Sequence, residues 1–234
     1  MMLLDAFSCA AIGADGYRAA GWEVVCLDND QRALAHARAG GYETVHGDAL
    51  ALLEDAGFMA QFDAVHASPP CQLFSATRRL AIAQGKGTGK RAVDLLHPTI
   101  DLFDGLDTPW VIENVERSPL RGRAGVVRFC GSSFGLRVQR HRLFLSNVAL
   151  VGPECDHSRF ELDPISGKPR PWGVYYAKGD NIPSGGRTCL TLEDGMAAMG
   201  VTREVPWKYL CEAIPPAFTE AIGRQLLGAV ASLA

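Results

Sequence analysis

Short apolar runs alternate with amphipathic stretches along the first half of the chain. The apolar runs are typical of buried strands, and they cover residues 2–7, 23–27, 43–46 and 62–67. Between these runs, the spacing of apolar positions predicts helices over residues 14–20, 31–39 and 49–56. Because strands that alternate with helices form βαβ units, the pattern predicts an α/β fold built on a parallel sheet.

The second half of the chain is less regular. It predicts a helix over residues 94–103 and strands at 109–112, 126–129 and 143–145. Residues 148–186 are rich in Pro, Gly and Ser and lack periodicity, which indicates a small irregular second lobe. Residues 216–231 place apolar side chains at helical spacing, so this helix should pack back on the sheet. We therefore expect a sheet domain at 1–147, a lobe at 148–187 and a returning segment at 188–234.

A cysteine directly follows one of the predicted strands. Cys71 lies in the turn Ser68-Pro69-Pro70-Cys71-Gln72, where two prolines restrict the backbone and hold the thiol in place. Taken alone, a cysteine is most often a buried apolar side chain. Ligands of open α/β sheets, however, collect beyond the carboxyl ends of the strands. The position of Cys71 therefore favours a nucleophile that faces a ligand.

A carboxyl group follows a later predicted strand. Glu113 directly follows the apolar run 109–112, so it should reach the same edge of the sheet as Cys71. By residue type alone, Glu113 is more often a surface carboxylate at the end of a strand or a helix cap than a catalytic group. Its neighbours change that balance, because Pro-Cys-Gln at 70–72 and Glu-Asn-Val at 113–115 resemble two active-site motifs of the DNA cytosine-5 methyltransferases.

The resemblance covers most of the chain, from Leu4 to about Leu227. Further similar segments are the first strand, the acids Asp28 and Asp48, the arginine-containing block 139–144 and the block 212–216. These blocks occur in the order that the family has. The resemblance implies a Rossmann-like, S-adenosylmethionine-dependent methyltransferase sheet in 1–147, with a short target-recognition lobe at 148–187.

The resemblance also implies roles for individual residues. The implied catalytic residues are Cys71, Glu113, Arg140 and Arg142. The implied contacts of the cofactor, S-adenosylmethionine, are Phe7, Ser8, Cys9, Ala11, Asp28, Asp48, Ala49 and Pro69. The implied nucleic-acid contacts are Gln72, Ser75, Arg78, Arg79, Lys86 and Arg170.

The chemistry of cytosine methylation explains why these residue types are needed. Carbon 5 of cytosine becomes a sufficient nucleophile only after a thiolate, here that of Cys71, adds to carbon 6. Glu113 would bond to or protonate ring nitrogen 3, and Arg140 or Arg142 would orient the pyrimidine oxygen. Because a base stacked in a duplex cannot reach such a site, the target nucleotide must be flipped out.

Two features near the start of the chain have more than one interpretation. Residues 8–12 read Ser-Cys-Ala-Ala-Ile where the family has a glycine-rich turn, so the backbone should adopt positive φ less readily. Asp28 follows a strand, and its position suits either a cofactor ribose or the cap of a helix that starts near Asp30.

The net charge of −3 conceals two cationic stretches. Residues 117–142 contain seven arginines, residues 76–92 contain five basic residues, and neither stretch contains an acid. Basic side chains supply most of the non-specific affinity for DNA, so we expect double-stranded DNA as the partner. RNA is an alternative substrate, since a flipped cytidine is chemically equivalent. A relative that binds DNA without methylating it is a third interpretation.

Cysteine usage and the N-terminus limit the remaining classes of protein. The seven cysteines show no Cys-x-x-Cys spacing, so neither a disulfide framework nor a zinc ribbon is expected. Cys155-Asp156-His157 alone supplies too few ligands for a tetrahedral site, and we expect no metal. No apolar run approaches the length of a membrane span, and no basic stretch precedes Leu3. We therefore expect a cytoplasmic monomer without membrane contact.

Overall fold

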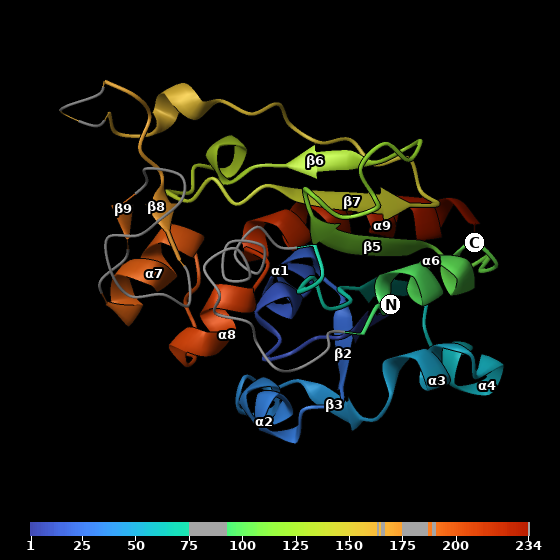
Figure 1. The fold of residues 1–234 in the computed structure, drawn as a ribbon. Coiled ribbons are helices and arrows are strands. Elements are labelled where there is room, and N and C mark those ends of the chain that lie inside the picture. The colour runs from blue at the N-terminus through green and yellow to red at the C-terminus, as the bar shows by residue number, and fades with distance from the viewer. Residues whose placement is uncertain (75–92, 163, 165–166, 175–186, 189–190, 234) are drawn as a thin grey trace.

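The computed structural model describes residues 1–74, 93–162, 164, 167–174, 187–188 and 191–233. Within these residues, seven strands form one sheet in the order β3-β2-β1-β4-β5-β7-β6 (Figure 1). The strands are β1 (Met2–Ala6), β2 (Glu23–Asp28), β3 (Glu43–His46), β4 (Ala64–Ala67), β5 (Trp110–Val115), β6 (Val127–Phe129) and β7 (Arg142–Ser146). The predicted α/β fold class is confirmed.

The strands from β3 to β5 are parallel, as the alternation of strands and helices predicts. β1 pairs with β2 on one side and with β4 on the other, so the order of connection reverses at β1. Such a switch point leaves a crevice at the carboxyl ends of the strands. Asp28 and Glu113 lie in strands that end at this edge, and Cys71 lies in the turn that follows β4.

The far end of the sheet differs from the parallel arrangement that the sequence predicts. β7 pairs antiparallel with β5 on one side and with β6 on the other. A parallel neighbour usually needs a crossover helix, whereas the chain between β6 and β7 forms only the 3-10 turn Gly131–Phe134. As a result Arg142, the first residue of β7, pairs with Val115, the last residue of β5.

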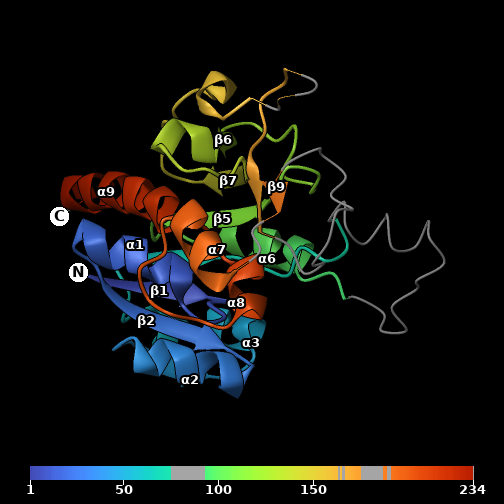
Figure 2. The same ribbon diagram turned by 90° about the vertical axis from the view of Figure 1, so that its left-hand side faces the viewer.

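Helices cover both faces of the sheet (Figures 1 and 2). One face carries α1 (Ile12–Ala20), α2 (Gln31–Ala39) and α9 (Pro216–Leu233), and the other carries α3 (Ala49–Leu53), α4 (Ala56–Met59) and α6 (Leu96–Phe103). Successive side chains of a strand point to opposite faces, so Leu3 is buried in the first layer and Leu4 in the second. The fold therefore has three layers, with one apolar core on each face of the sheet.

The C-terminal helix α9 returns to the sheet domain and packs against α1, as its apolar spacing predicts. The fully buried side chains of α9 are Phe218, Thr219, Ile222 and Leu226. Two polar contacts fix the packing: Thr219 Oγ1 donates to Gly13 O at 2.6 Å, and Trp22 Nε1 donates to Gly223 O at 2.9 Å. This contact holds the start of α1 beside the crevice.

The helices differ from the prediction at three places. The predicted helix 49–56 is divided into α3 and α4, because Asp55 Oδ1 accepts hydrogen bonds from Gly57 N and Phe58 N and caps a new helix. α7 (Leu192–Met199) and α8 (Trp207–Glu212) were not predicted. None of the described helices combines the length and the apolar character that crossing a bilayer requires.

The irregular part of the chain contains only short elements. The 3-10 turn His157–Arg159 follows the sheet, and β8 (Trp172–Gly173) pairs parallel with β9 (Arg187–Thr188). Trp172 N donates to Arg137 O at 2.8 Å, and Val174 is buried in a third apolar cluster with residues of α7 and α8. This cluster joins the irregular segment to the C-terminal part of the chain.

A close contact between helices makes the α1–α9 packing testable. A Cβ on Gly16 would lie 2.0 Å from Pro216 O, so no side chain fits there. We predict that Gly16→Ala lowers the free energy of unfolding by about 1–3 kcal/mol. Gly228→Ala in α9, whose added Cβ meets nothing within 4 Å, should raise it by about 0.5–1 kcal/mol. Urea denaturation measures the free energy of unfolding of both variants. If the two substitutions changed it equally, this packing of α1 on α9 would be contradicted.

Candidate active site

A cavity of about 1080 Å³ opens at the carboxyl edge of the sheet. Its wall combines residues that end or follow β1, β2 and β4 with residues 138–142 and with lobe residues 171–174. Pockets for a single small ligand measure about 300–1000 Å³, so this cavity has room for a large ligand or for two smaller ones.

The turn that carries Cys71 is held by its neighbouring strands, and Cys71 lines the cavity. Asn114, fully buried in β5, donates from Nδ2 to Pro69 O at 2.9 Å. Ser68 N donates to Ala6 O at 3.1 Å, at the end of the β1–β4 ladder. The thiol is therefore fixed relative to both β1 and β5.

Glu113 and Arg142 form a buried ion pair beside Cys71. Arg142 Nε lies 2.8 Å from Glu113 Oε1, and this oxygen receives no aligned hydrogen bond from any described residue. Burial raises the pKa of the Glu113 carboxyl, although the positive charges of Arg142 and His66 oppose the rise. A carboxyl group with a raised pKa keeps its proton to higher pH. Glu113 itself is not among the residues that line the cavity, and it adjoins the cavity through its partner Arg142.

The Cys71 thiol lies in the field of the same charges. Burial raises the pKa of Cys71, the charge of Arg142 opposes this rise, the charge of Glu113 adds to it, and Arg140 again opposes it. The structure therefore brings the four residues that the sequence implies as catalytic into one electrostatic neighbourhood.

The two arginines have different partners. Arg140 donates from Nε to Ala213 O at 2.8 Å and from Nη2 to Cys211 O at 2.6 Å, which ties it to the end of α8. Its φ of 33° is left-handed, so the surrounding contacts hold a strained backbone. Arg142 instead pairs with Glu113. Both arginines line the cavity, so either is placed to orient a ligand there.

A buried polar network, which the sequence analysis did not single out, adjoins Glu113. His66 Nδ1 lies 3.0 Å from Asp5 Oδ1, and His66 Nε2 lies 3.2 Å from Ser68 Oγ. All three residues line the cavity. In the sequence, the network is marked only by two polar residues, Asp5 and His66, within apolar runs that predict strands. The register, in which Asp5 pairs with His66, shows that they meet.

The turn after β1 has a left-handed backbone at three residues that are not glycine. φ is 58° at Phe7, 52° at Cys9 and 58° at Ala11. This conformation costs a residue with a Cβ about 1–2 kcal/mol. The chain thus adopts, at an energetic cost, backbone conformations for which glycine is normally used.

Asp28 ends β2 and lines the cavity. Its Oδ2 accepts a hydrogen bond from Cys9 N and its Oδ1 accepts one from Asp30 N, each at 2.8 Å. The cap of α2 is Asp30, whose Oδ1 accepts from Arg32 N and Ala33 N. Of the two interpretations of Asp28, the helix cap is therefore wrong, and its carboxylate belongs to the cavity wall.

The structure places the other predicted contact residues in three groups. The cavity wall includes Phe7, Ser8, Cys9, Pro69 and Gln72. Four residues lie away from the wall: Ala11 and Ala49, which are buried, Asp48, which caps α3, and Arg170 in the lobe. Ser75, Arg78, Arg79 and Lys86 lie outside the described residues.

Comparisons with known proteins establish the fold. Neither a family model nor a curated protein matches the sequence. A mutant of DNMT2 from Spodoptera frugiperda matches with a TM-score of 0.52 and 13% identity, covering 99% of this chain and 98% of its own. The methyltransferase EhMeth of Entamoeba histolytica matches with a TM-score of 0.61 and 12% identity, covering 98% of each chain. The chain therefore shares its fold with these two proteins.

The left-handed turn predicts an unusual response to glycine. Ala11→Gly should leave the free energy of unfolding unchanged or raise it by up to about 1 kcal/mol, because relief of strain offsets the lost methyl group. Ala19→Gly, on the exposed side of α1, should instead lower it by about 1 kcal/mol. Chemical denaturation compares the two variants. A loss at Ala11 as large as that at Ala19 would contradict the left-handed conformation.

The charges around Cys71 predict how its reactivity depends on pH. Because burial raises the pKa of Cys71, its alkylation by iodoacetamide should increase with pH only above the range in which a free cysteine titrates. Arg142→Gln should move this rise to higher pH, and Glu113→Gln should move it to lower pH. Mass spectrometry of the Cys71 peptide measures the rise. Arg224→Gln, at an exposed position of α9, should not move it, and shifts of the same sign for the first two variants would contradict the arrangement.

Proposed function

We propose that the chain transfers a methyl group from S-adenosylmethionine to carbon 5 of cytosine in DNA. The observation that carries this proposal is the meeting of the Cys71 thiol with the Glu113–Arg142 pair beside one cavity. A thiol next to a carboxyl group of raised pKa suits covalent catalysis on a pyrimidine ring. The motifs at 70–72 and 113–115 and the fold shared with DNMT2 and EhMeth support the same conclusion.

The part of the cavity beside β1 and β2 suits the cofactor. The Asp28 carboxylate would bind a ribose hydroxyl, and Phe7 and Cys9 line the same wall. α1 begins without a side-chain cap from any described residue, so the amides of its first turn are available to a carboxylate. When bound, S-adenosylmethionine supplies an electrophilic methyl group on a sulfonium.

The residues of this chain would act on the base in a defined order. The Cys71 thiolate bonds to carbon 6, the ring electrons shift, and nitrogen 3 takes a proton from Glu113, which leaves carbon 5 in an enamine. The methyl group would pass to carbon 5 as its bond to the sulfonium sulfur breaks and leaves the thioether S-adenosylhomocysteine, and nitrogen 3 returns its proton to Glu113. Transfer of the carbon 5 proton to water and departure of the Cys71 thiolate from carbon 6 would restore the ring. Arg142 stabilises the Cys71 thiolate and holds Glu113 in position.

The position of the lobe supports a nucleic-acid substrate. Lobe residues 171–174 line the cavity together with the strand ends, and Arg117, the first residue of the arginine-rich stretch 117–142, also lines it. We assign residues 148–187 to contacts with the DNA around a flipped cytosine, with basic residues such as Arg159, Lys168 and Arg170 bonding to phosphates or base edges.

Methyl transfer from labelled S-adenosylmethionine to duplex DNA tests the function. The wild-type protein should label cytosine, and Cys71→Ala should reduce labelling to background because the thiolate that adds to carbon 6 is lost. Cys26→Ala is the matched control, since this thiol is buried in β2 away from the cavity wall, and it should retain transfer. Transfer by Cys71→Ala would contradict the mechanism.

The choice of nucleic acid gives separate outcomes in the same assay. Transfer to RNA but not to duplex DNA would contradict the assignment to DNA while leaving the chemistry of Cys71 intact. Binding of DNA without transfer to either nucleic acid, in protein that also binds S-adenosylmethionine, would contradict the enzymatic assignment.

A further inference from the structure

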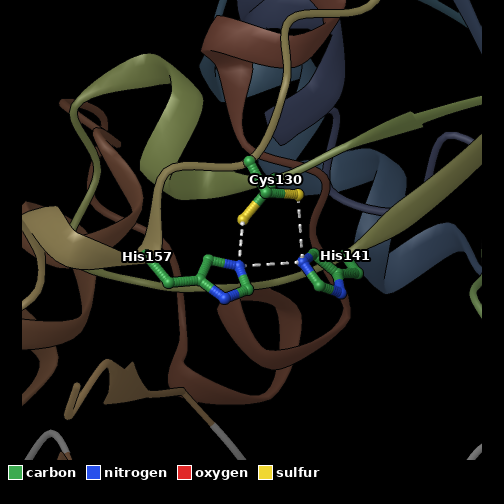
Figure 3. Close-up of side chains that lie close together, drawn as sticks. Cys130, His141 and His157 are labelled. Carbon is green, nitrogen blue, oxygen red and sulfur yellow. Dashed lines mark hydrogen bonds between the residues drawn. The ribbon is translucent and has the colours of Figure 1, made fainter. Parts of the chain in front are cut away.

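Four metal-binding side chains converge next to the candidate active site. The ligand atoms of Cys130, His141, Cys155 and His157 all lie within 4.8 Å of one another. Figure 3 shows Cys130, His141 and His157 pointing toward a common centre. Sequence separation hides this group, because Cys130 and His141 lie well before the Cys155-Asp156-His157 segment that alone has too few ligands.

We infer that these four residues bind one zinc ion in a closed, tetrahedral Cys₂His₂ site. Zinc bonds of about 2.3 Å to sulfur and about 2.0–2.1 Å to nitrogen place tetrahedral ligands about 3.3 Å apart for two nitrogens and about 3.5 Å apart for nitrogen and sulfur. His141 Nε2 and His157 Nε2 are 3.3 Å apart. Cys130 Sγ lies 3.4 Å from His157 Nε2, and Cys155 Sγ lies 3.5 Å from His141 Nε2.

The contacts around His141 prepare it to bind a metal. Its Nδ1 lies 3.1 Å from Glu116 Oε2, and Glu116 Oε1 in turn pairs with Arg128 at 3.1 Å. A carboxylate on Nδ1 holds the proton there, which leaves the Nε2 lone pair directed toward the other three ligands. Metal-bound histidines regularly have such a carboxylate partner.

The chemistry of the ligands selects the ion and its role. Two thiolates and two imidazoles in a tetrahedron suit zinc, whereas magnesium and calcium prefer oxygen ligands. With four protein ligands the ion has no open position, so it would stabilise structure and would not activate water.

The site joins two parts of the fold. Cys130 directly follows β6 and His141 directly precedes β7, whereas Cys155 and His157 belong to the segment that leaves the sheet. The ion would therefore fasten this segment to the β6–β7 connection. His141 lies between Arg140 and Arg142 in the sequence, so the ion would also position the arginines of the active site; this second consequence rests on the proposed function.

Metal analysis of the purified protein tests the inference without any assay of activity. Protein expressed with added zinc and then dialysed should contain about one zinc per chain by inductively coupled plasma mass spectrometry. Cys155→Ser and His157→Asn should lose most of this zinc. Cys26→Ala and His97→Asn, which change the same residue types outside the cluster, should retain it. A wild-type protein without zinc, or full zinc in Cys155→Ser, would overturn the site.

Cobalt substitution and melting provide a second test in folded protein. Cobalt(II) should give the intense visible bands of tetrahedral coordination and the near-ultraviolet band of thiolate ligation, and both should disappear in Cys155→Ser. Removal of zinc by a chelator should lower the melting temperature by at least about 5 °C, and added zinc should restore it. Weak bands typical of octahedral cobalt, or an unchanged melting temperature, would contradict a structural Cys₂His₂ site.

The positioning role has its own readout. Cys155→Ser should lower kcat for methyl transfer while leaving the KM for S-adenosylmethionine unchanged, because the cofactor end of the cavity lies at β1 and β2. Cys155→His, which keeps four ligands, should restore both zinc and kcat. If zinc is present but kcat does not depend on it, the positioning role is wrong and the metal site stands. If no variant transfers methyl groups, the proposed function fails independently of the zinc measurement.

Discussion

The candidate site depends on one buried ion pair, between Glu113 on β5 and Arg142 on β7. The pair exists because β7 is antiparallel to β5: Arg142 pairs with Val115 in the register, which places it diagonally across from Glu113. Burying two charges is costly, so such a pair contributes little to stability. The pair instead affects the protonation of the site. The two charges shift the pKa of Cys71 in opposite directions, and the Arg142 charge opposes the rise that burial causes in the pKa of Glu113.

The sequence predicted most of the sheet and its helices because their apolar periodicity is strong. β3 and α2 have the predicted bounds, and the shared edge of Cys71 and Glu113 followed from the rule that ligands bind beyond the carboxyl ends of strands. The sequence did not predict the antiparallel β7, because a strand's direction depends on its connection and not on its own residues. α7 and α8 were missed because they are short and adjoin segments without periodicity.

Contacts between residues far apart in sequence were also beyond sequence analysis. The Asp5–His66 pair needs the register of β1 and β4, and the group of Cys130, His141, Cys155 and His157 needs the packing of an irregular segment on the β6–β7 connection. The left-handed turn at Phe7, Cys9 and Ala11 was hidden for a different reason: local propensity opposes it, and the fold overrides that propensity. Local preference and observed structure thus disagree at the edge where ligands would bind, as is common at functional sites.

A covalent trap with 5-fluorocytosine tests whether Cys71 bonds to the target base. Fluorine at carbon 5 cannot leave as a proton does, so a duplex oligonucleotide that contains 5-fluorocytosine, incubated with the protein and S-adenosylmethionine, should remain bonded to the protein. Mass spectrometry of the digested complex should locate the modified base, now carrying the transferred methyl group, on Cys71. An adduct on a different residue, or no adduct under conditions in which unmodified DNA is methylated, would contradict the account.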